Sequence, residues 1–422
     1  MPLSRYQIPY GKTQIEFEIP DVFHVETLSP GTFAGPSDPA PAVFDALDHA
    51  LGNVRLAHYA NAQSVAIAIN DKTRPVPLRT LLPPLLQRLG EIGIPDRAIT
   101  FLVATGAHAP MDSAEFADLV PSAILFRYHF VSHNCDDQAN LVYLGNTTRG
   151  TPIWVNRGFI DADLRIVVGN LEPHQFMGYS GGVKPAAIGL AGRETITHNH
   201  SMMLDPSSNI ARYDDNPARQ DVEAIGKLIG VHLALNSIVD ANKQIAAVLA
   251  GDPSEVMLRG IPLALDLYCA RVDEPFDLVI ASPGGHPKDI NLYQAQKALA
   301  HATFVVRPGG TVILCAACPE GTGSHLYDEW MSDKTSHAQV LDTFKREGYR
   351  LGAHKAFLIS RDASRERVMF VTEMPSDLVA KSLLTSFATL DAALVAALHD
   401  LLLGARVGIL PYANATIPQV KQ

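Results

Sequence analysis

The sequence predicts an α/β protein that is built from two α/β domains. Apolar, β-branched runs typical of buried strands alternate with segments of helical periodicity, and this alternation occurs twice along the chain. At 422 residues the chain also exceeds the size of one ordinary hydrophobic core. We therefore expect a larger domain at residues 1–270 and a smaller one at 271–401, with residues 402–422 returning to the larger domain as a strand.

The larger domain is expected to begin with a β-ribbon and a loop rich in proline and glycine. The elements predicted after them are a helix at 42–50, a strand at 64–70, a helix at 78–93, a strand at 98–106, a helix from 113, strands at 124–131, 141–147 and 151–159, and a strand at 164–168. Pro75 and Pro77 exclude a helix or a central strand directly after the first of these strands. The three strands in quick succession indicate an antiparallel insert.

The smaller domain shows the same alternation. Its predicted elements are a strand from 276 that ends in a glycine turn, a helix at 289–302, a strand at 309–317, a helix at 340–348, a strand at 367–374 and an apolar strand at 406–414. Asp289 is the expected N-cap of the first helix, because a carboxylate there can accept hydrogen bonds from the first helical N–H groups.

Composition excludes several classes of protein. The formal net charge is -10 and there is no basic run, which argues against nucleic acid or an anionic membrane as a partner. No apolar run approaches the roughly 18 residues that a membrane helix needs, and the N-terminus has no apolar secretory segment. The four cysteines are few and scattered, as in a reducing compartment, so a cytoplasmic location is expected. Cys315 and Cys318 form one CxxC without a second pair, which favours buried thiols over a zinc site.

Residues 169–200 hold the densest group of chemically active side chains. His174, Lys184 and a glycine-rich turn at 178–182 follow directly after the apolar strand at 164–168. Ligands of open α/β sheets bind at the ends of such strands. No GxGxxG follows a strand, and Val183 separates the turn from Lys184, so neither a standard dinucleotide fold nor a P-loop is supported. The residues alone leave open whether the turn holds a phosphate or is a plain tight turn.

The remaining histidines give weaker signals. His108 lies in a loop between a strand and a helix, where an imidazole can do acid–base work or can simply be a surface residue. His198 and His200 would share a face only on an extended segment, since on a helix at most one of them can face a given site. His129 and His133 receive no role from the sequence.

Two polar pairs complete the set of candidates. Asp71 and Arg74 follow the strand at 64–70, where Arg74 could clamp a carboxylate or simply pair with Asp71. Gln294 and Lys297 are three residues apart on a predicted helix that is otherwise apolar, so they are neighbours on one face. That face is either solvated or lines a cleft.

The order of these motifs resembles the nickel-dependent lactate racemase family. DKTRP, ATGAHAP, EPHQFMGYSGGVKP, the Asn-His of THNH and LYQAQKA follow one another from about Asp71 to Ala298. The resemblance implies two α/β domains with the active site between them. It also implies nickel and a pyridinium-3-thioamide-5-thiocarboxylic acid mononucleotide, which enzymes of cofactor synthesis would supply.

The resemblance implies a role for each matching residue. Lys184 matches the lysine that holds the cofactor covalently, and His200 matches the nickel ligand. His108 and His174 match the two acid–base histidines. The residues expected beside the cofactor are Thr105, Gly106, Gly181 and Gly182, and those expected beside the substrate are Asp71, Arg74, Gln294 and Lys297.

The function expected from the resemblance is racemisation or epimerisation of a small 2-hydroxy acid. The C2 hydrogen would leave as hydride while a histidine takes the hydroxyl proton, which avoids a dianion next to the carboxylate. Two other hypotheses compete with this one. The first is a zinc-dependent hydrolase that uses His174, His198 and His200, and the second is a non-catalytic protein that binds the nickel cofactor.

Overall fold

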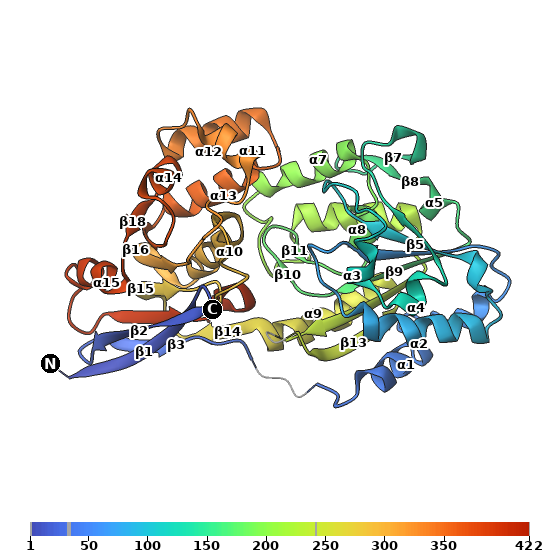
Figure 1. The fold of residues 1–422 in the computed structure, drawn as a ribbon, viewed down its shortest axis with the longest axis horizontal. Helices are drawn as coiled ribbons and strands as arrows, with labels where there is room; N and C mark the ends of the chain where they lie inside the picture. Colours follow the sequence, from blue (N-terminus) through green and yellow to red (C-terminus); the bar gives the residue numbers. More distant parts are fainter. Residues whose placement is uncertain (1, 32–34, 241–242, 422) are drawn as a thin grey trace. The chain divides into compact units, whose positions relative to one another are not determined.

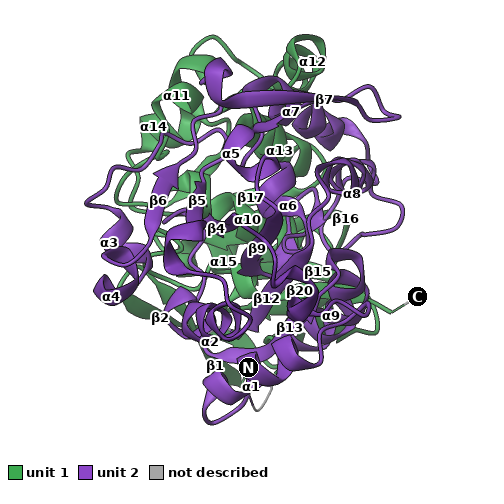
Figure 2. Cartoon of the chain, turned by 90° about the vertical axis from the view of Figure 1, so that its right-hand side faces the viewer, with its two compact units in different colours: residues 1–31, 268–422 green, residues 32–267 purple. Residues whose placement is uncertain are grey.

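The computed structural model describes residues 2–31, 35–240 and 243–421, and it confirms the α/β class. The chain forms two compact units (Figure 2). Unit 1 comprises residues 1–31 and 268–422, and unit 2 comprises residues 32–267. This division differs from the expected domains at both ends of the chain. The N-terminal hairpin and the segment 402–422 belong to unit 1, because strands at the two ends of the chain pair within its sheet.

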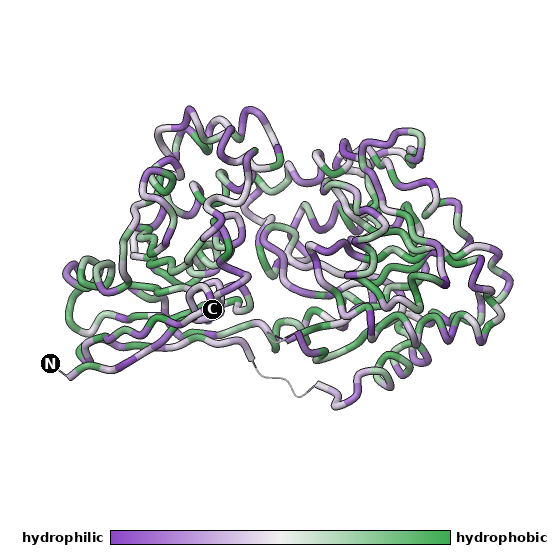
Figure 3. Tube along the Cα trace, viewed as in Figure 1, coloured by the Kyte–Doolittle hydropathy of each residue, from purple (hydrophilic) through white to green (hydrophobic). Residues whose placement is uncertain are grey.

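Unit 2 (Figure 1) is built on a six-stranded sheet, whose strands follow the order β13-β12-β9-β4-β5-β6 (Figure 2). All neighbouring pairs are parallel except β12 and β13. The strands are β4 (Val65–Asn70), β5 (Ile99–Ala104), β6 (His129–Ser132), β9 (Leu164–Asn170), β12 (Leu233–Val239) and β13 (Ile245–Gly251). The central strands are buried on both faces, which explains their continuous apolar runs (Figure 3).

Helices cover both faces of this sheet. Leucines of α2 and apolar residues of α1 pack with alternate residues of β4, β5, β9 and β12 in one core, while α5 and α6 contact β4. The helices of unit 2 are α1 (Pro39–Asp48), α2 (Leu78–Glu91), α3 (Phe116–Leu119), α4 (Ser122–Leu125), α5 (Arg157–Ile160), α6 (Lys184–Ala187), α7 (Arg193–Ser201), α8 (Pro217–Ile229) and α9 (Pro253–Tyr268), whose last residue belongs to unit 1. A small hairpin, β10 (Pro173–His174) and β11 (Gly178–Tyr179), follows β9.

The expected antiparallel insert is smaller than predicted. β7 (Leu141–Asn146) and β8 (Pro152–Asn156) pair antiparallel as expected. The segment 124–131 is not one strand. Its first residues close α4, and only β6 is extended and joins the main sheet parallel to β5.

Unit 1 is built on a parallel sheet in the order β18-β17-β16-β15-β19-β3. Its strands are β3 (His24–Thr27), β15 (Phe276–Ala281), β16 (Val306–Cys315), β17 (Arg367–Val371), β18 (Thr385–Phe387) and β19 (Arg406–Leu410). A short parallel pair, β14 (Cys269–Val272) and β20 (Ile417–Val420), lies outside this sheet. The pairing of β19 with β15 is why the C-terminal segment stays in this unit.

Two different layers cover the sheet of unit 1. One face packs against α10 (Leu292–Ala302) and α13 (Ala353–Ala363), and the other packs against α15 (Leu390–Leu398) and the hairpin of β1 (Leu3–Tyr10) and β2 (Thr13–Pro20). The remaining helices are α11 (His325–Met331), α12 (His337–Glu347) and α14 (Ser376–Lys381). Asn291, not Asp289, caps α10, because the Asn291 side chain accepts from the N–H of Gln294.

The tip of the N-terminal hairpin lies against the carboxyl ends of β15 and β16. Ser282 Oγ donates to the carbonyl of Pro9 at 2.5 Å, and the His286 N–H donates to the carbonyl of Gly11 at 2.6 Å. The buried carboxylate of Asp289 accepts from the N–H of Gly11 at 2.6 Å and from that of Ala317 at 3.3 Å. The chain therefore fills this part of its own sheet edge.

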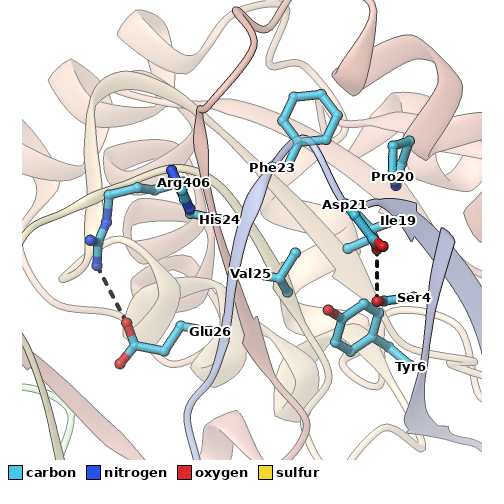
Figure 4. Close-up of a pocket in the computed structure, with 10 residues that line it drawn as sticks. All are labelled: Ser4, Tyr6, Ile19, Pro20, Asp21, Phe23, His24, Val25, Glu26 and Arg406. Atoms are coloured by element: carbon cyan, nitrogen blue, oxygen red, sulfur yellow. Dashed lines mark hydrogen bonds and ion pairs between the residues drawn. The ribbon is translucent and has the colours of Figure 1, made fainter. Parts of the chain in front are cut away.

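A hollow of about 470 Å³ lies elsewhere on unit 1, beside β1, β2 and β3 (Figure 4). Ser4 donates to Asp21 and Arg406 pairs with Glu26 along its wall. None of the predicted site residues lines this hollow. In the described part of the chain, no helix is both long and apolar enough to cross a membrane.

Candidate active site

The predicted residues of unit 2 gather at the carboxyl ends of its parallel strands. Asp71 follows β4, His108 follows β5, and His174 follows β9. The chain runs from β4 outward to β5 and β6, and then returns to the other side of β4 as β9. The strand order therefore reverses between β4 and β9, and this is the position at which open α/β sheets bind ligands.

Asp71 holds His108. The imidazole Nδ1 of His108 lies 2.6 Å from Asp71 Oδ2, while Asp71 Oδ1 accepts from both the N–H and the hydroxyl of Thr73. Burial alone would raise the pKa of Asp71, but the hydrogen bonds from His108 and Thr73 outweigh it and lower the pKa. An ionised Asp71 can only accept, so Nδ1–H of His108 donates to it, and in the neutral, half-exposed ring Nε2 carries the lone pair. Asp71 is thus placed to orient the imidazole of His108.

The rings of His174 and His200 both contact the ring of Phe176. The ring of Phe176 is 5.0 Å from that of His174 and 5.1 Å from that of His200, both in edge-on geometry. Nδ1 of His174 accepts from the N–H of Met177 at 3.3 Å, so the neutral ring carries its proton on Nε2. The structure therefore brings together two of the histidines that the sequence singled out.

Lys184 is a buried amine. It begins the short helix α6 one residue after the glycine turn, and the residue is 9% exposed. Burial, together with the positive charges of Arg74 and Arg219, holds the pKa of Lys184 well below its ordinary value, and only Glu172 opposes this. A lysine in such surroundings favours the neutral amine, which is the nucleophilic form.

The glycine turn is packed against protein atoms. Gly181 and Gly182 both have positive φ, and a Cβ on either would meet atoms of Asn236, Leu171, Met257 or Arg219 at about 3 Å. The N–H of Gly182 donates to Asn236 Oδ1 at 2.7 Å. The turn therefore needs glycine for its own conformation and close packing.

Thr105 and Gly106 are likewise engaged within the protein. The Thr105 hydroxyl donates to the carbonyl of His133 at 2.8 Å, and the Gly106 N–H donates to the carbonyl of Gly189 at 2.9 Å. These contacts fix the loop that carries His108, since the His108 N–H in turn donates to the carbonyl of Thr105.

The segment THNH is helical, so its two histidines point in different directions. His198 is exposed and its Nδ1 lies 2.8 Å from Thr151 Oγ1, whereas His200 contacts Phe176. Among the described residues, no group of three or more His, Cys, Asp or Glu side chains is placed to hold a metal ion. The arrangement does not favour a zinc hydrolase that needs His174, His198 and His200 together.

The other predicted residues lie in two places. Arg74 is an exposed residue of the turn after β4, where its N–H donates to the carbonyl of Asp71. Gln294 and Lys297 belong to α10 of unit 1, and Lys297 Nζ donates to Gln294 Oε1 at 3.1 Å. The two therefore form a pair on one helix face, as the spacing predicted.

Of the other residues that the sequence singled out, His133, Cys315 and Cys318 are buried. His133 is buried between the carbonyl of Ala191 and the amide of Asn156, and burial lowers its pKa. His129 is exposed on β6. Cys315 and Cys318 are buried, free thiols whose pKa is raised by burial, which confirms the prediction for the CxxC.

Sequence reasoning missed three buried polar residues of α8. Asn216, Arg219 and Asp221 are 0% exposed, and each binds a segment near the candidate site. The signal in the sequence is faint. PARQDVEAIG reads as an amphipathic helix, and nothing in one sequence distinguishes a buried charge from a solvated one.

Two family models match this chain. The lactate racemase N-terminal domain matches residues 10–211, and the lactate racemase C-terminal domain matches residues 272–417. The lactate racemase of Thermoanaerobacterium thermosaccharolyticum is 27% identical over 351 residues, which are 82% of each chain. The lactate racemase of Lactiplantibacillus plantarum is 29% identical over 340 residues, which are 79% of this chain and 80% of the relative.

Solved structures share the fold of this chain. The lactate racemase apoprotein from T. thermosaccharolyticum superposes with a TM-score of 0.90 at 26% identity, covering 99% of this chain and 100% of that one. A structural-genomics protein from Thermotoga maritima shares the fold at a TM-score of 0.65 and 19% identity, covering 91% of this chain and 99% of that one. The chain belongs to the lactate racemase family, and it is an enzyme of the isomerase class, a racemase.

Proposed function

We propose that this racemase acts on a small 2-hydroxy acid, with nickel and a pyridinium mononucleotide that is attached to Lys184. The observation that carries the proposal is the buried Lys184 amine beside the sheet edge that also holds the Asp71–His108 pair. The names of the two lactate racemases support this substrate class. Nickel and the nucleotide follow from the resemblance of the motifs.

The residues present fit such a cofactor. A lysine whose neutral form is favoured by burial is suited to forming a covalent bond with an acyl-type group. The positive charge of the exposed Arg74 near Lys184 suits an anionic nucleotide. His200 would supply a single imidazole ligand to nickel, the remaining ligands coming from the cofactor. When bound, the pyridinium ring would supply a hydride acceptor.

The chain's own residues would move the proton and hold the substrate. His108 would take the hydroxyl proton at Nε2 while Asp71 holds its Nδ1–H. His174 carries its proton on Nε2 and would donate from the other side. The resemblance assigns binding of the substrate carboxylate to Arg74, Gln294 and Lys297. Such contacts would keep the 2-oxo acid bound by its carboxylate while the rest of it turns over.

The proposal is tested on protein produced together with enzymes of cofactor synthesis. We expect an intact mass that shows an adduct on Lys184, and about one nickel per adduct. A 2-hydroxy acid that carries deuterium at C2 should be racemised with its label largely retained, because hydride transfer shields the hydrogen from water. His200→Ala should lose nickel, whereas His198→Ala should keep it.

Three outcomes would contradict parts of this proposal. Washout of deuterium into water would mean that the histidines abstract the hydrogen as a proton. Equal loss of nickel in both histidine variants would remove the special role of His200. An adduct that binds nickel without any racemisation of 2-hydroxy acids would indicate a cofactor-binding protein.

A further inference from the structure

The buried polar side chains of α8 connect three segments that carry the candidate residues. Asn216, Arg219 and Asp221 lie at the N-cap and in the first turns of this helix, and all three are fully buried. Buried polar groups stabilise a fold only when they are hydrogen-bonded, and the helix itself needs only its N-cap to be polar. The hydrogen-bond partners of the three side chains therefore show which segments the helix supports.

Arg219 holds the turn that precedes Lys184. Its guanidinium donates to the carbonyl of Tyr179 at 2.9 Å and to that of Gly181 at 3.3 Å, and its Nε donates to Glu223 at 2.9 Å. A planar guanidinium fixes the positions of several acceptors at once. The same positive charge also lowers the pKa of Lys184.

Asp221 holds α7, the helix that carries His200. Oδ2 of Asp221 accepts from the amide of Asn199 at 2.9 Å and from the hydroxyl of Thr151 at 2.8 Å, and Oδ1 accepts from the hydroxyl of Thr147 at 2.6 Å. Asn199 precedes His200, and successive helical residues are about 100° apart. Fixing Asn199 against α8 thus fixes the direction in which His200 points.

The same network accounts for His198. The single hydroxyl proton of Thr151 goes to Asp221, so Nδ1 of His198 must donate to Thr151 Oγ1 across their 2.8 Å contact. His198 is thereby the exposed end of a chain of hydrogen bonds that ends on Asp221.

Asn216 holds the loop between His174 and the glycine turn. Its amide donates to the carbonyl of Phe176 at 2.8 Å, while its Oδ1 accepts from the N–H of Arg219 and caps the helix. Phe176 is the residue whose ring contacts both His174 and His200.

We propose that α8 is a positioning platform, in which Arg219 sets the geometry of the Lys184 turn and Asp221 sets the direction of His200. The proposal rests on the proposed function of those two residues. It assigns separable roles: Arg219 acts on covalent attachment, and Asp221 acts on metal retention. Plain core stabilisation would affect both properties together.

The test compares Arg219→Lys, Asp221→Asn and Thr151→Val with matched controls. Thr151→Ser keeps the hydroxyl, and Lys227→Gln changes an exposed residue of the same helix. Each variant is produced with cofactor-synthesis enzymes. The fraction of chains that carry the Lys184 adduct is then measured by intact mass, and nickel per adduct is measured after dialysis against EDTA.

Arg219→Lys is expected to lower the adduct fraction several-fold with unchanged nickel per adduct. Asp221→Asn and Thr151→Val are expected to keep the adduct but retain nickel about 10-fold less well, the usual effect of losing support behind a metal ligand. Both controls should match the parent. Variants that change the two readouts in proportion, or change neither, would overturn the proposal.

Hydrogen exchange of the apoprotein tests the platform without the cofactor. Asp221→Asn should speed amide exchange at 193–201 more than at 178–184, and Arg219→Lys should do the reverse. If Arg219→Lys does not fold, Glu223→Gln removes the ion-pair partner of Arg219 and should act in the same direction. A parent protein that carries neither adduct nor nickel would refute the proposed function, but the exchange pattern would still test whether α8 positions the two segments. Faster exchange that is uniform over both segments would overturn the positioning role of α8.

Discussion

The two units share an architecture but use the equivalent edge of the sheet differently. In unit 2, the loops after β4, β5 and β9 present Asp71, His108 and His174. In unit 1, the strand order reverses between β15 and β19, but the tip of the N-terminal hairpin is bonded to the loop after β15. The strand order alone therefore predicts a ligand site at both edges. The residues at each edge show which one is open to a ligand and which one is filled by the chain. Unit 1 offers its candidate residues, Gln294 and Lys297, from a helix face instead.

The largest expected effect comes from removing the amine in unit 2. Lys184→Met should abolish the adduct and racemisation, yet it should stabilise the apoprotein, because a buried amine with a lowered pKa disfavours folding. In the parent, the unfolded chain binds the proton more tightly, so stability rises with pH toward the ordinary lysine value of 10.5.

The gain from Lys184→Met should therefore be largest at low pH and shrink as the pH approaches that value. Urea unfolding of parent and variant apoproteins between pH 6 and pH 10 checks this. A variant that is less stable than the parent throughout would mean that the lysine is paired and charged when buried.

A smaller effect is expected from the acid–base pair. His108→Ala should lower kcat by about 10²- to 10⁴-fold, the usual contribution of general acid–base catalysis, with the Lys184 adduct intact. Asp71→Asn should cost less, because an amide oxygen still accepts from Nδ1 but without the charge. Steady-state rates with each enantiomer, at matched adduct content, give the comparison. Equal losses in the two variants would mean that Asp71 also touches the substrate.

The smallest effect on activity is expected from the edge of unit 1. Asp289→Ala removes the buried oxygen that accepts from the N–H groups of Gly11 and Ala317, so the free energy of unfolding should fall by about 1–3 kcal/mol. The kcat should not change, since this edge is filled by the chain itself. A fall in kcat at full adduct and nickel content would show that the two edges are not as different as we describe.

The sequence predicted those parts of the molecule that local patterns determine. Apolar runs located β4, β5 and β9, and the rule on strand ends placed Asp71, His108 and His174 at one edge. The spacing of Gln294 and Lys297 predicted their contact.

Features that depend on long-range contacts were not predictable. The pairing of β3 with β19 joins segments near the two ends of the chain, so neither segment reveals its unit by itself. Asp289 looked like an N-cap from its position, but its carboxylate serves the hairpin tip while Asn291 caps α10. The burial of Arg219 and Asp221 also depends on what packs above them.

The insertion of unit 2 into unit 1 has a consequence for synthesis of the chain. Unit 2 is one continuous segment, 32–267, whereas the sheet of unit 1 needs β3 from its beginning and β19 from its end. Domains fold during translation as their residues emerge, at about 5–20 residues per second. The unit that carries Lys184, His108, His174 and His200 can thus be complete while unit 1 still lacks most of its strands. Residues 268–422 follow over about 8–30 seconds, so the buried surroundings of Lys184 can form before the sheet of unit 1 does.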